Sequence, residues 1–398
     1  MKLRLCLCLA AISLALATVP AETARRPRYG GVLRLEIGAL VNPPYPALPA
    51  TTPKQAAAKE QIDALIYDSR NREGGSGPFQ VAEWEPGKHA TLSANEKAPG
   101  GRPYVDSIQI QMGRSPREML LDLELSKADL AEIPVEQARQ AADRGVRVSM
   151  SQPDELLALV FLPGRAAMED ARVREALAQS IDRGSIVNFI LQKTGEAAGG
   201  LLPQWSSGTA FLFPTAADSA RAKELWAQIA ASPKLVLGYD SGDPLEQSVA
   251  ERIVVNARES GISLAAQAIP PAPAAGAAAT PATATATPPA AFDARLIRLS
   301  MTSPLPRPAL TSLLTTLGGM TTIDASPLPD PATPEDIYNR QRAVVSSFRV
   351  VPLVWLPHVY GLSQRVRNWK APGPGETWPL ADVWLDGPPD AASEKEKP

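Results

Sequence analysis

The chain has 398 residues, of which 44% are hydrophobic, which excludes a disordered chain and is enough for two or three domains. Its 40 Lys and Arg residues nearly balance 42 Asp and Glu residues, and the formal net charge of -2 argues against a nucleic-acid partner. The 40 prolines and 27 glycines predict irregular segments between the folded parts.

The first residues have the pattern of a secretory signal peptide. Two basic residues precede an apolar run from Leu5 to Leu16, which is shorter than the roughly 20 residues that cross a bilayer. Small residues then offer cleavage points, so we predict a signal peptide over residues 1–21 and a periplasmic or secreted location. Both cysteines, Cys6 and Cys8, lie within it, so the mature chain can form no disulfide.

Hydrophobic periodicity predicts strands and helices along the first part of the mature chain. Strands are expected where apolar and polar residues alternate, and helices where apolar residues recur every three or four positions. The expected strands are residues 30–37, 79–84, 90–94, 105–112 and 130–133, and the expected helices are 54–67, 116–125 and 135–143. The second and third of these strands should form an antiparallel hairpin.

A second α/β pattern follows. Residues 156–162 are apolar throughout, as expected of a central strand that is buried on both faces. Further helices are expected at 170–181, 185–191, 219–231, 245–260 and 334–347, and further strands at 234–239, 262–268, 294–299 and 350–355. Residues 270–291 contain only Ala, Pro, Thr and one Gly, which predicts a low-complexity linker, and residues 388–398 are predicted to be a disordered tail.

Residues that could carry catalysis are sparse. His89 and His358 are the only histidines and stand far apart, and neither a zinc-protease spacing nor a nucleophile elbow is present, so we expect no enzyme, no cofactor and no metal. His358 follows an apolar strand and could reach a cleft, although a surface or hydrogen-bonded position is the commoner case. Among the tryptophans, Trp205 lies in a loop and is the most free to line a pocket.

Several motifs stand in a recognisable order. They are GGVLR at 30–34, GSGPF at 75–79 with WEPG at 84–87, GRPYVDSI at 101–108, DARVREAL at 170–177 with SIDR at 180–183, GGLLP at 199–203 and AKELW at 222–226. In this order they resemble the family 5 extracellular solute-binding proteins, the dipeptide-, oligopeptide- and nickel-binding receptors of ABC importers.

The resemblance implies an α/β fold of two lobes, of the type II periplasmic-binding-protein kind, that close on a ligand by a hinge. Lobe I should comprise residues 28–158 and 355–387, and lobe II residues 159–354. Between Tyr67 and Gly75, where the family carries a long region that completes the first lobe, this chain has only a few residues. We therefore expect one subdomain of lobe I to be largely missing.

The resemblance also places the ligand site between the lobes. The expected ligand-binding residues are Gly38, Ala39, Trp205, Arg298, Ser300, Met301 and Thr302. Peptide-binding members hold the ligand's amino terminus with an acidic residue on the second lobe, but the matching stretch 298–304 has no carboxylate. We therefore expect weak binding of ordinary di- and tripeptides, and a preference for neutral or anionic groups.

The sequence thus predicts a secreted, monomeric substrate-binding protein of an ABC importer, which is not an enzyme. Its partners would be a small-molecule or peptide-like solute and a membrane permease. The alternative is a degenerate homologue that acts as a structural or protein-interaction module without a transport ligand. Cargo recovered with the purified protein would distinguish the two.

Overall fold

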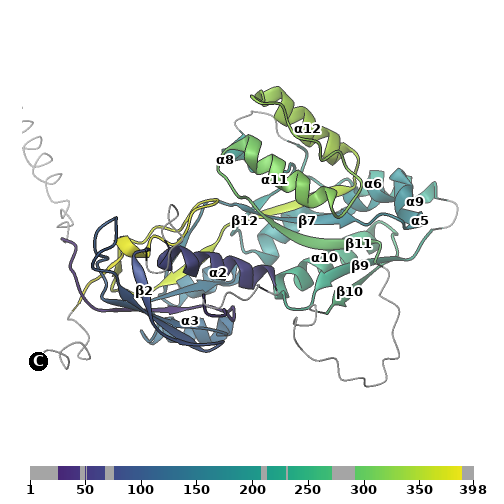
Figure 1. Ribbon diagram of the computed structural model, residues 1–398. Coiled ribbons are helices and arrows are strands. Elements are labelled where there is room, and N and C mark those ends of the chain that lie inside the picture. Colours follow the sequence, from purple (N-terminus) through teal and green to yellow (C-terminus); the bar gives the residue numbers. More distant parts are fainter. Residues whose placement is uncertain are drawn as a thin grey trace, which may run out of the picture.

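The computed structural model describes residues 26–44, 50, 52–67, 76–207, 213–229, 232–270 and 292–387, which form two α/β lobes (Figure 1). The predicted signal peptide, the predicted tail and nearly all of the predicted linker at 270–291 lie outside the described residues. None of the helices in the described ranges is long and apolar enough to span a membrane.

Lobe I is built on a seven-stranded sheet. Its strands, in spatial order, are β2 (Phe79–Glu85), β3 (His89–Ala94), β4 (Ser107–Gln111), β1 (Val32–Glu36), β5 (Leu130–Ile133), β13 (Val359–Leu362) and β6 (Arg147–Met150). Its helices are α2 (Pro53–Ile66), α3 (Pro116–Glu124), a 3₁₀ turn at Val135–Gln137, α4 (Ala138–Asp143) and a 3₁₀ turn at Leu380–Asp382, and β14 (Val366–Arg367) pairs with β15 (Trp384–Leu385). Both ends of the described chain therefore belong to this lobe.

Lobe II is built on a six-stranded sheet. In spatial order the strands are β10 (Leu264–Ile269), β9 (Leu235–Asp240), β11 (Ala294–Ser300), β7 (Glu155–Phe161), β12 (Val350–Leu356) and β8 (Glu196–Ala197). The helices are α5 (Ala166–Glu169), α6 (Ala171–Ser180), α7 (Arg183–Ser185), a π-helical turn at Ile186–Ile190, α8 (Gln204–Ser207), α9 (Ser219–Ala227), α10 (Pro244–Glu259), α11 (Pro306–Gly318) and α12 (Pro334–Ser346).

Two short connections join the sheets. One runs through residues 151–154, between β6 and β7, and the other through residues 357–358, between β12 and β13. The divisions predicted at 158/159 and 354/355 fall inside β7 and β12, which the structure places whole in lobe II because each pairs along its length with neighbours there.

The strand directions determine what the two lobes present to each other. In lobe I, β1 runs parallel to both β4 and β5, so their carboxyl ends lie at the edge from which the chain crosses to lobe II. In lobe II, β9, β10 and β11 run parallel, and β11 and β12 are both antiparallel to β7, so their carboxyl ends lie where β7 begins. Carboxyl ends of strands therefore face each other across the crossing connections, the usual place for a ligand in α/β sheets.

The end of α2 and the residues just before β2 are in close main-chain contact. The N–H of Gly77 donates to the carbonyl oxygen of Ile66, the last residue of α2, at 2.9 Å. A Cβ on Gly77 would lie 2.5 Å from the Ile66 carbonyl carbon, so only glycine fits there. The end of α2 thus rests directly on the start of β2.

Glu36, at the end of β1, gives lobe I a pH-dependent stability. Burial, with Asp122 as the next cause, raises the pKa of Glu36 to about 7. The folded state therefore holds a proton that the unfolded state releases near pH 4.5, and the free energy of unfolding falls as the pH rises from about 4.5 to about 7.

Replacing Glu36 with Gln should remove this fall and make the protein about 3 kcal/mol more stable than wild type at pH 8. Urea denaturation between pH 5 and pH 8 measures the effect. Glu60→Gln, an exposed change on α2, is the control and should keep the wild-type pH profile. An unchanged profile in Glu36→Gln would show that another group causes the pH dependence.

Candidate ligand-binding site

The residues expected to bind the ligand come from both facing edges. Gly38 and Ala39 follow β1 in lobe I, whereas the residues from Arg298 to Thr302 end β11 and follow it in lobe II. The side chains of Ala39 and Met301 are only 7% and 4% exposed and pack into the cores of their lobes, so only their main chains are left to a ligand.

Lys54 lies beside Gly38 in lobe I and acts electrostatically on Glu132. Its Nζ would lie 3.0 Å from a Cβ on Gly38, and its charge lowers the pKa of Glu132 at the carboxyl end of β5. Arg298 of lobe II also lowers the pKa of Glu132. Residues expected from the two lobes therefore share one electrostatic neighbourhood.

Arg298 is held by two carboxylates of its own lobe. Its Nη1 lies 2.7 Å from Oε2 of Glu155, at the start of β7, and its Nε lies 2.6 Å from Oδ2 of Asp243. Although burial disfavours the charge, these two carboxylates raise the pKa of Arg298 above its ordinary value. The stretch 298–304 has no carboxylate of its own, but the fold brings two carboxylates to Arg298 from far away in the sequence.

Asp243 is itself a fixed group. It is the N-cap of α10, where its side chain accepts hydrogen bonds from the N–H groups of Leu245, at 2.9 Å, and Glu246, at 3.2 Å. An acidic N-cap satisfies free N–H groups and the positive end of the helix dipole. The ion pair with Arg298 is thus anchored on the first turn of a long helix.

His358 bridges two carboxylates at the second crossing. Its Nδ1 lies 3.2 Å from Oε1 of Glu132, and its Nε2 lies 3.7 Å from Oδ1 of Asp154. Burial lowers the pKa of His358, but Glu132, with smaller contributions from Glu155 and Asp154, outweighs burial and raises it to about 9. The imidazole is therefore charged at neutral pH and joins the strand β5 to the connection before β7.

Glu132 and Glu136 carry the lobe I side of this network. The side chain of Glu132 is 45% exposed, yet the surrounding protein desolvates its carboxylate, as expected for a side chain that lies between the two lobes. Burial raises the pKa of Glu136, whose nearest charged influences are Arg298 and Asp243 of the other lobe. Charged side chains of the two lobes therefore influence one another electrostatically.

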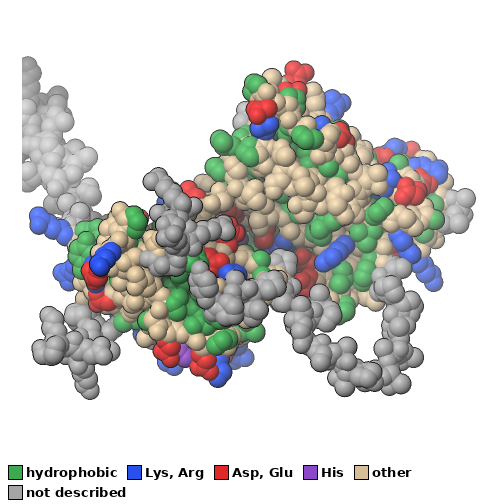
Figure 2. Space-filling view, in the orientation of Figure 1, with side chains coloured by type: hydrophobic (Ala, Val, Ile, Leu, Met, Phe, Trp, Pro, Cys, Tyr) green, Lys and Arg blue, Asp and Glu red, His purple; other side chains and the backbone are tan. Residues whose placement is uncertain are grey.

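The network has more carboxyl groups than cations. Its carboxyl groups include Glu132, Glu136, Asp154, Glu155, Asp243 and Glu246, and its cations include Lys54, Arg298 and His358. Burial raises the pKa of Asp154 to about 6, so it is mostly ionised at neutral pH. Figure 2 shows acidic and basic side chains together where the lobes meet.

Trp205 is hydrogen-bonded to the first crossing connection. Its Nε1 donates to the carbonyl oxygen of Pro153 at 2.9 Å, and its side chain remains partly exposed beside the site. Ser300 and Thr302 are exposed at the end of β11. Of the expected residues, therefore, Gly38, Trp205, Arg298, Ser300 and Thr302 keep exposed surface.

The carboxylates are the residues that sequence reasoning missed. Their common signal is position, since Glu132 and Asp243 stand at or just after the carboxyl end of a predicted strand. That position could have identified them once the strands were expected to be parallel. Within the described ranges, no group of three or more His, Cys, Asp or Glu side chains has the arrangement of a metal site.

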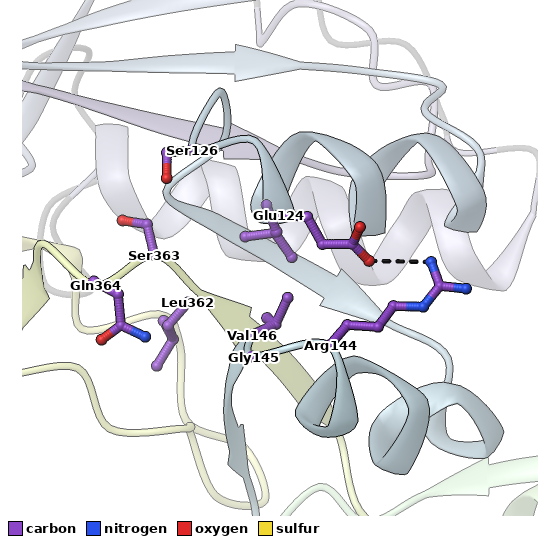
Figure 3. A pocket seen from close by; sticks show the side chains of 9 residues that line it. Glu124, Ser126, Arg144, Gly145, Val146, Leu362, Ser363 and Gln364 are labelled. Atoms are coloured by element: carbon purple, nitrogen blue, oxygen red, sulfur yellow. Dashed lines mark hydrogen bonds and ion pairs between the residues drawn. The ribbon is translucent and has the colours of Figure 1, made fainter.

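Cavities also lie elsewhere in the described part of the chain. One of about 80 Å³ lies in lobe I beside the ion pair of Glu124 and Arg144 (Figure 3), and its lining includes Leu362, at the end of β13 opposite to His358. A groove of about 500 Å³ lies in lobe II at the start of α11 and α12. It is lined mainly by apolar side chains: Leu305, Pro306, Pro308, Ala332, Pro334 and Ile337.

The sequence matches known binding proteins over much of its length. Residues 32–318 match the family described as bacterial extracellular solute-binding proteins, family 5 Middle. The chain is 27% identical over 195 residues to the probable D,D-dipeptide-binding periplasmic protein DdpA of Escherichia coli K12, covering 47% of this chain and 37% of that protein. It is 29% identical over 154 residues to the oligopeptide-binding protein AppA of Bacillus subtilis 168, covering 37% and 28% respectively. The chain thus matches about a third of the length of these relatives.

Solved structures share the fold. The oligopeptide-binding protein AppA from Bacillus subtilis, in complex with a nonapeptide, has a TM-score of 0.59 at 16% identity, covering 84% of this chain and 70% of that one. NikA from Staphylococcus aureus, in complex with Ni(L-His)2, has a TM-score of 0.61 at 16% identity, covering 80% and 72%. The chain therefore belongs to family 5 of the bacterial extracellular solute-binding proteins, a family of binding proteins rather than enzymes, and has the predicted two-lobe type II periplasmic-binding-protein fold.

Proposed function

We propose that this protein is the substrate-binding component of an ABC-type importer and binds, between its lobes, a small or peptide-like solute that carries a positively charged group. Family membership supports the role in uptake, and the excess of carboxyl groups at the facing edges supports the charge of the ligand. The protein would act outside the cytoplasm as a monomer and deliver its ligand to a membrane permease.

The proposed positive charge of the ligand rests on the negative charge of the site. An ammonium group that enters a recess without a partner costs several kcal/mol, enough to remove most of a micromolar affinity of about 8 kcal/mol. Glu136 is placed to offset that cost, because a carboxyl group whose pKa is raised by burial ionises more readily next to a cation. Lobe I would then supply the acidic partner that the stretch 298–304 of lobe II lacks.

The names of two relatives fit such a ligand. DdpA is described as D,D-dipeptide-binding and AppA as oligopeptide-binding, and free peptides carry an ammonium group. The apolar groove that begins at Ser207 and Leu305, close in sequence to Trp205 and Thr302, would accept apolar side chains of such a solute. The proposal therefore replaces the expected preference for neutral or anionic ligands.

Titration calorimetry on the mature protein with trialanine and N-acetyl-trialanine tests the proposal. The free amine should bind at least tenfold more tightly, a difference of about 1.4 kcal/mol. Glu136→Gln should weaken binding of the free peptide about tenfold and leave the acetylated peptide unchanged. Glu60→Gln, which is exposed on α2, should change neither.

Two results would contradict the proposal. Equal or tighter binding of the acetylated peptide would mean that the carboxylates are fully neutralised by Arg298, His358 and Lys54. Failure of both peptides to bind, together with purified protein that carries no cargo, would favour the alternative of an interaction module without a ligand.

A further inference from the structure

A turn of lobe I touches the segment of lobe II that follows β11. The N–H of Glu376 donates to the carbonyl oxygen of Gly373 at 2.9 Å, which closes a β-turn with Pro374 and Gly375 at its centre. Gly375 has a φ of +73°, as the third residue of a type II turn requires. A Cβ on Gly375 would lie 2.5 Å from the carbonyl oxygen of Thr302, so the tip of the turn rests on the main chain of the other lobe.

The turn is fixed to lobe I. The N–H of Gly373 donates to Oε2 of Glu376 at 2.8 Å, which braces the turn from within. Gln61 of α2 holds its far side, because its Oε1 accepts from the N–H of Trp378 at 2.8 Å and its Nε2 donates to the carbonyl oxygen of Glu376 at 3.5 Å. The turn therefore moves with α2.

The segment that meets the turn is fixed to the first crossing connection and to lobe II. The N–H of Met301 donates to the carbonyl oxygen of Asp154 at 2.8 Å, and Oγ of Ser206 donates to the carbonyl oxygen of Pro304 at 3.0 Å. Thr302 lies between these two anchors. Two braced pieces of backbone thus meet where a glycine hydrogen fits and a methyl group does not.

We propose that the turn at Gly373–Glu376 is a stop between the lobes, which sets how far they close and so positions Thr302 opposite lobe I. The proposal of a stop rests on the contact between Gly375 and Thr302 alone. Its expected effect on ligand affinity rests in addition on the proposed ligand site. Gly375 acts as a positioning residue, because its size determines the closest approach of the two lobes.

The stop predicts that Gly375→Ala opens the lobes. Ordinary contact begins at 3.4 Å, so the two backbones must separate by about 0.9 Å at the turn, the difference between 3.4 and 2.5 Å, and the shift grows toward the outer ends of the lobes. Gly164→Ala is the matched control, since Gly164 has a similar φ of +78° and its Cβ would meet nothing within 4 Å. It carries the same backbone strain without the contact.

Distances between spin labels measure the opening in the mature chain, which lacks cysteine if the predicted signal peptide is removed. Labels on Arg117→Cys in α3 and Thr316→Cys in α11, both exposed, report one lobe each. The mean distance should lengthen in Gly375→Ala and stay at the wild-type value in Gly164→Ala. Gln61→Ala, which frees the turn from α2, should broaden the distribution even if Gly375→Ala fails to fold.

A distance distribution in Gly375→Ala or Gln61→Ala that coincides with wild type would overturn the stop. Trialanine titration of the same variants separates the two proposals. Longer distances with several-fold weaker binding support both. Longer distances with unchanged binding keep the stop and overturn the placement of the ligand between the lobes.

Discussion

Replacing Leu177 with Asp is expected to prevent the protein from folding. Leu177 lies on the buried face of α6, is 1% exposed and belongs to the large apolar core that reaches from lobe II into lobe I. An unpaired carboxylate there would cost several kcal/mol, in addition to the cavity left by the leucine, against a total stability of about 5–15 kcal/mol. Val173→Asp, one turn earlier on the same face, should have the same effect.

Soluble yield and thermal melting of the mature variants measure this effect. Ala171→Asp is the control, because Ala171 is exposed in the first turn of the same helix, where a negative charge is favourable. It should melt near the wild-type temperature. A Leu177→Asp variant that melts cooperatively near wild type would contradict the assignment of this helix face to the core.

Replacing Asp129 with Ala is expected to destabilise lobe I by about 3–5 kcal/mol. The side chain of Asp129 is fully buried and accepts hydrogen bonds from Nε of Arg34 at 2.9 Å, from Nε of Arg365 at 2.7 Å and from Oγ of Ser363 at 2.9 Å. Burial opposes its charge, but Arg365 and Arg34 outweigh burial and lower the pKa of Asp129, so it is ionised. Its loss would leave two guanidinium groups without their shared partner.

Urea denaturation at pH 7 measures this loss. Asp129→Asn keeps the shape and part of the hydrogen bonding, so it should fall between wild type and Asp129→Ala. Asp143→Ala is the control, since Asp143 is exposed and its nearest approach to Arg139 is 4.0 Å, which makes their pair worth about 0–1 kcal/mol. Equal effects of Asp129→Ala and Asp143→Ala would show that the buried network adds no stability.

Local pattern was enough to predict the longer elements. The helices expected at 170–181 and 245–260 are confirmed as α6 and α10, and the apolar strand expected at 156–162 is confirmed as β7. The pattern missed β6, β13 and α11. The two strands have only four residues each, and they form because they pair with strands far away in the chain. Helix α11 has two prolines among its first three residues, a pattern that is typical of a loop.

The candidate site could be predicted only in part, for a similar reason. Arg298 lies at the end of a predicted strand, but its ion-pair partners are Glu155 and Asp243, 143 and 55 residues away. His358 likewise takes its charge from Glu132, 226 residues away. A linear pattern gives the type of each group, whereas the fold determines which groups become neighbours.

The position of β13 fixes the order in which lobe I can be assembled. This strand lies between β5 and β6 and forms antiparallel ladders with both, although it begins only at Val359. During synthesis, therefore, β6 has no sheet partner, and the sheet stays open on one side until nearly the whole polypeptide has left the ribosome. The nascent chain therefore cannot complete the sheet of lobe I before residues 359–362 are available to join β5 and β6.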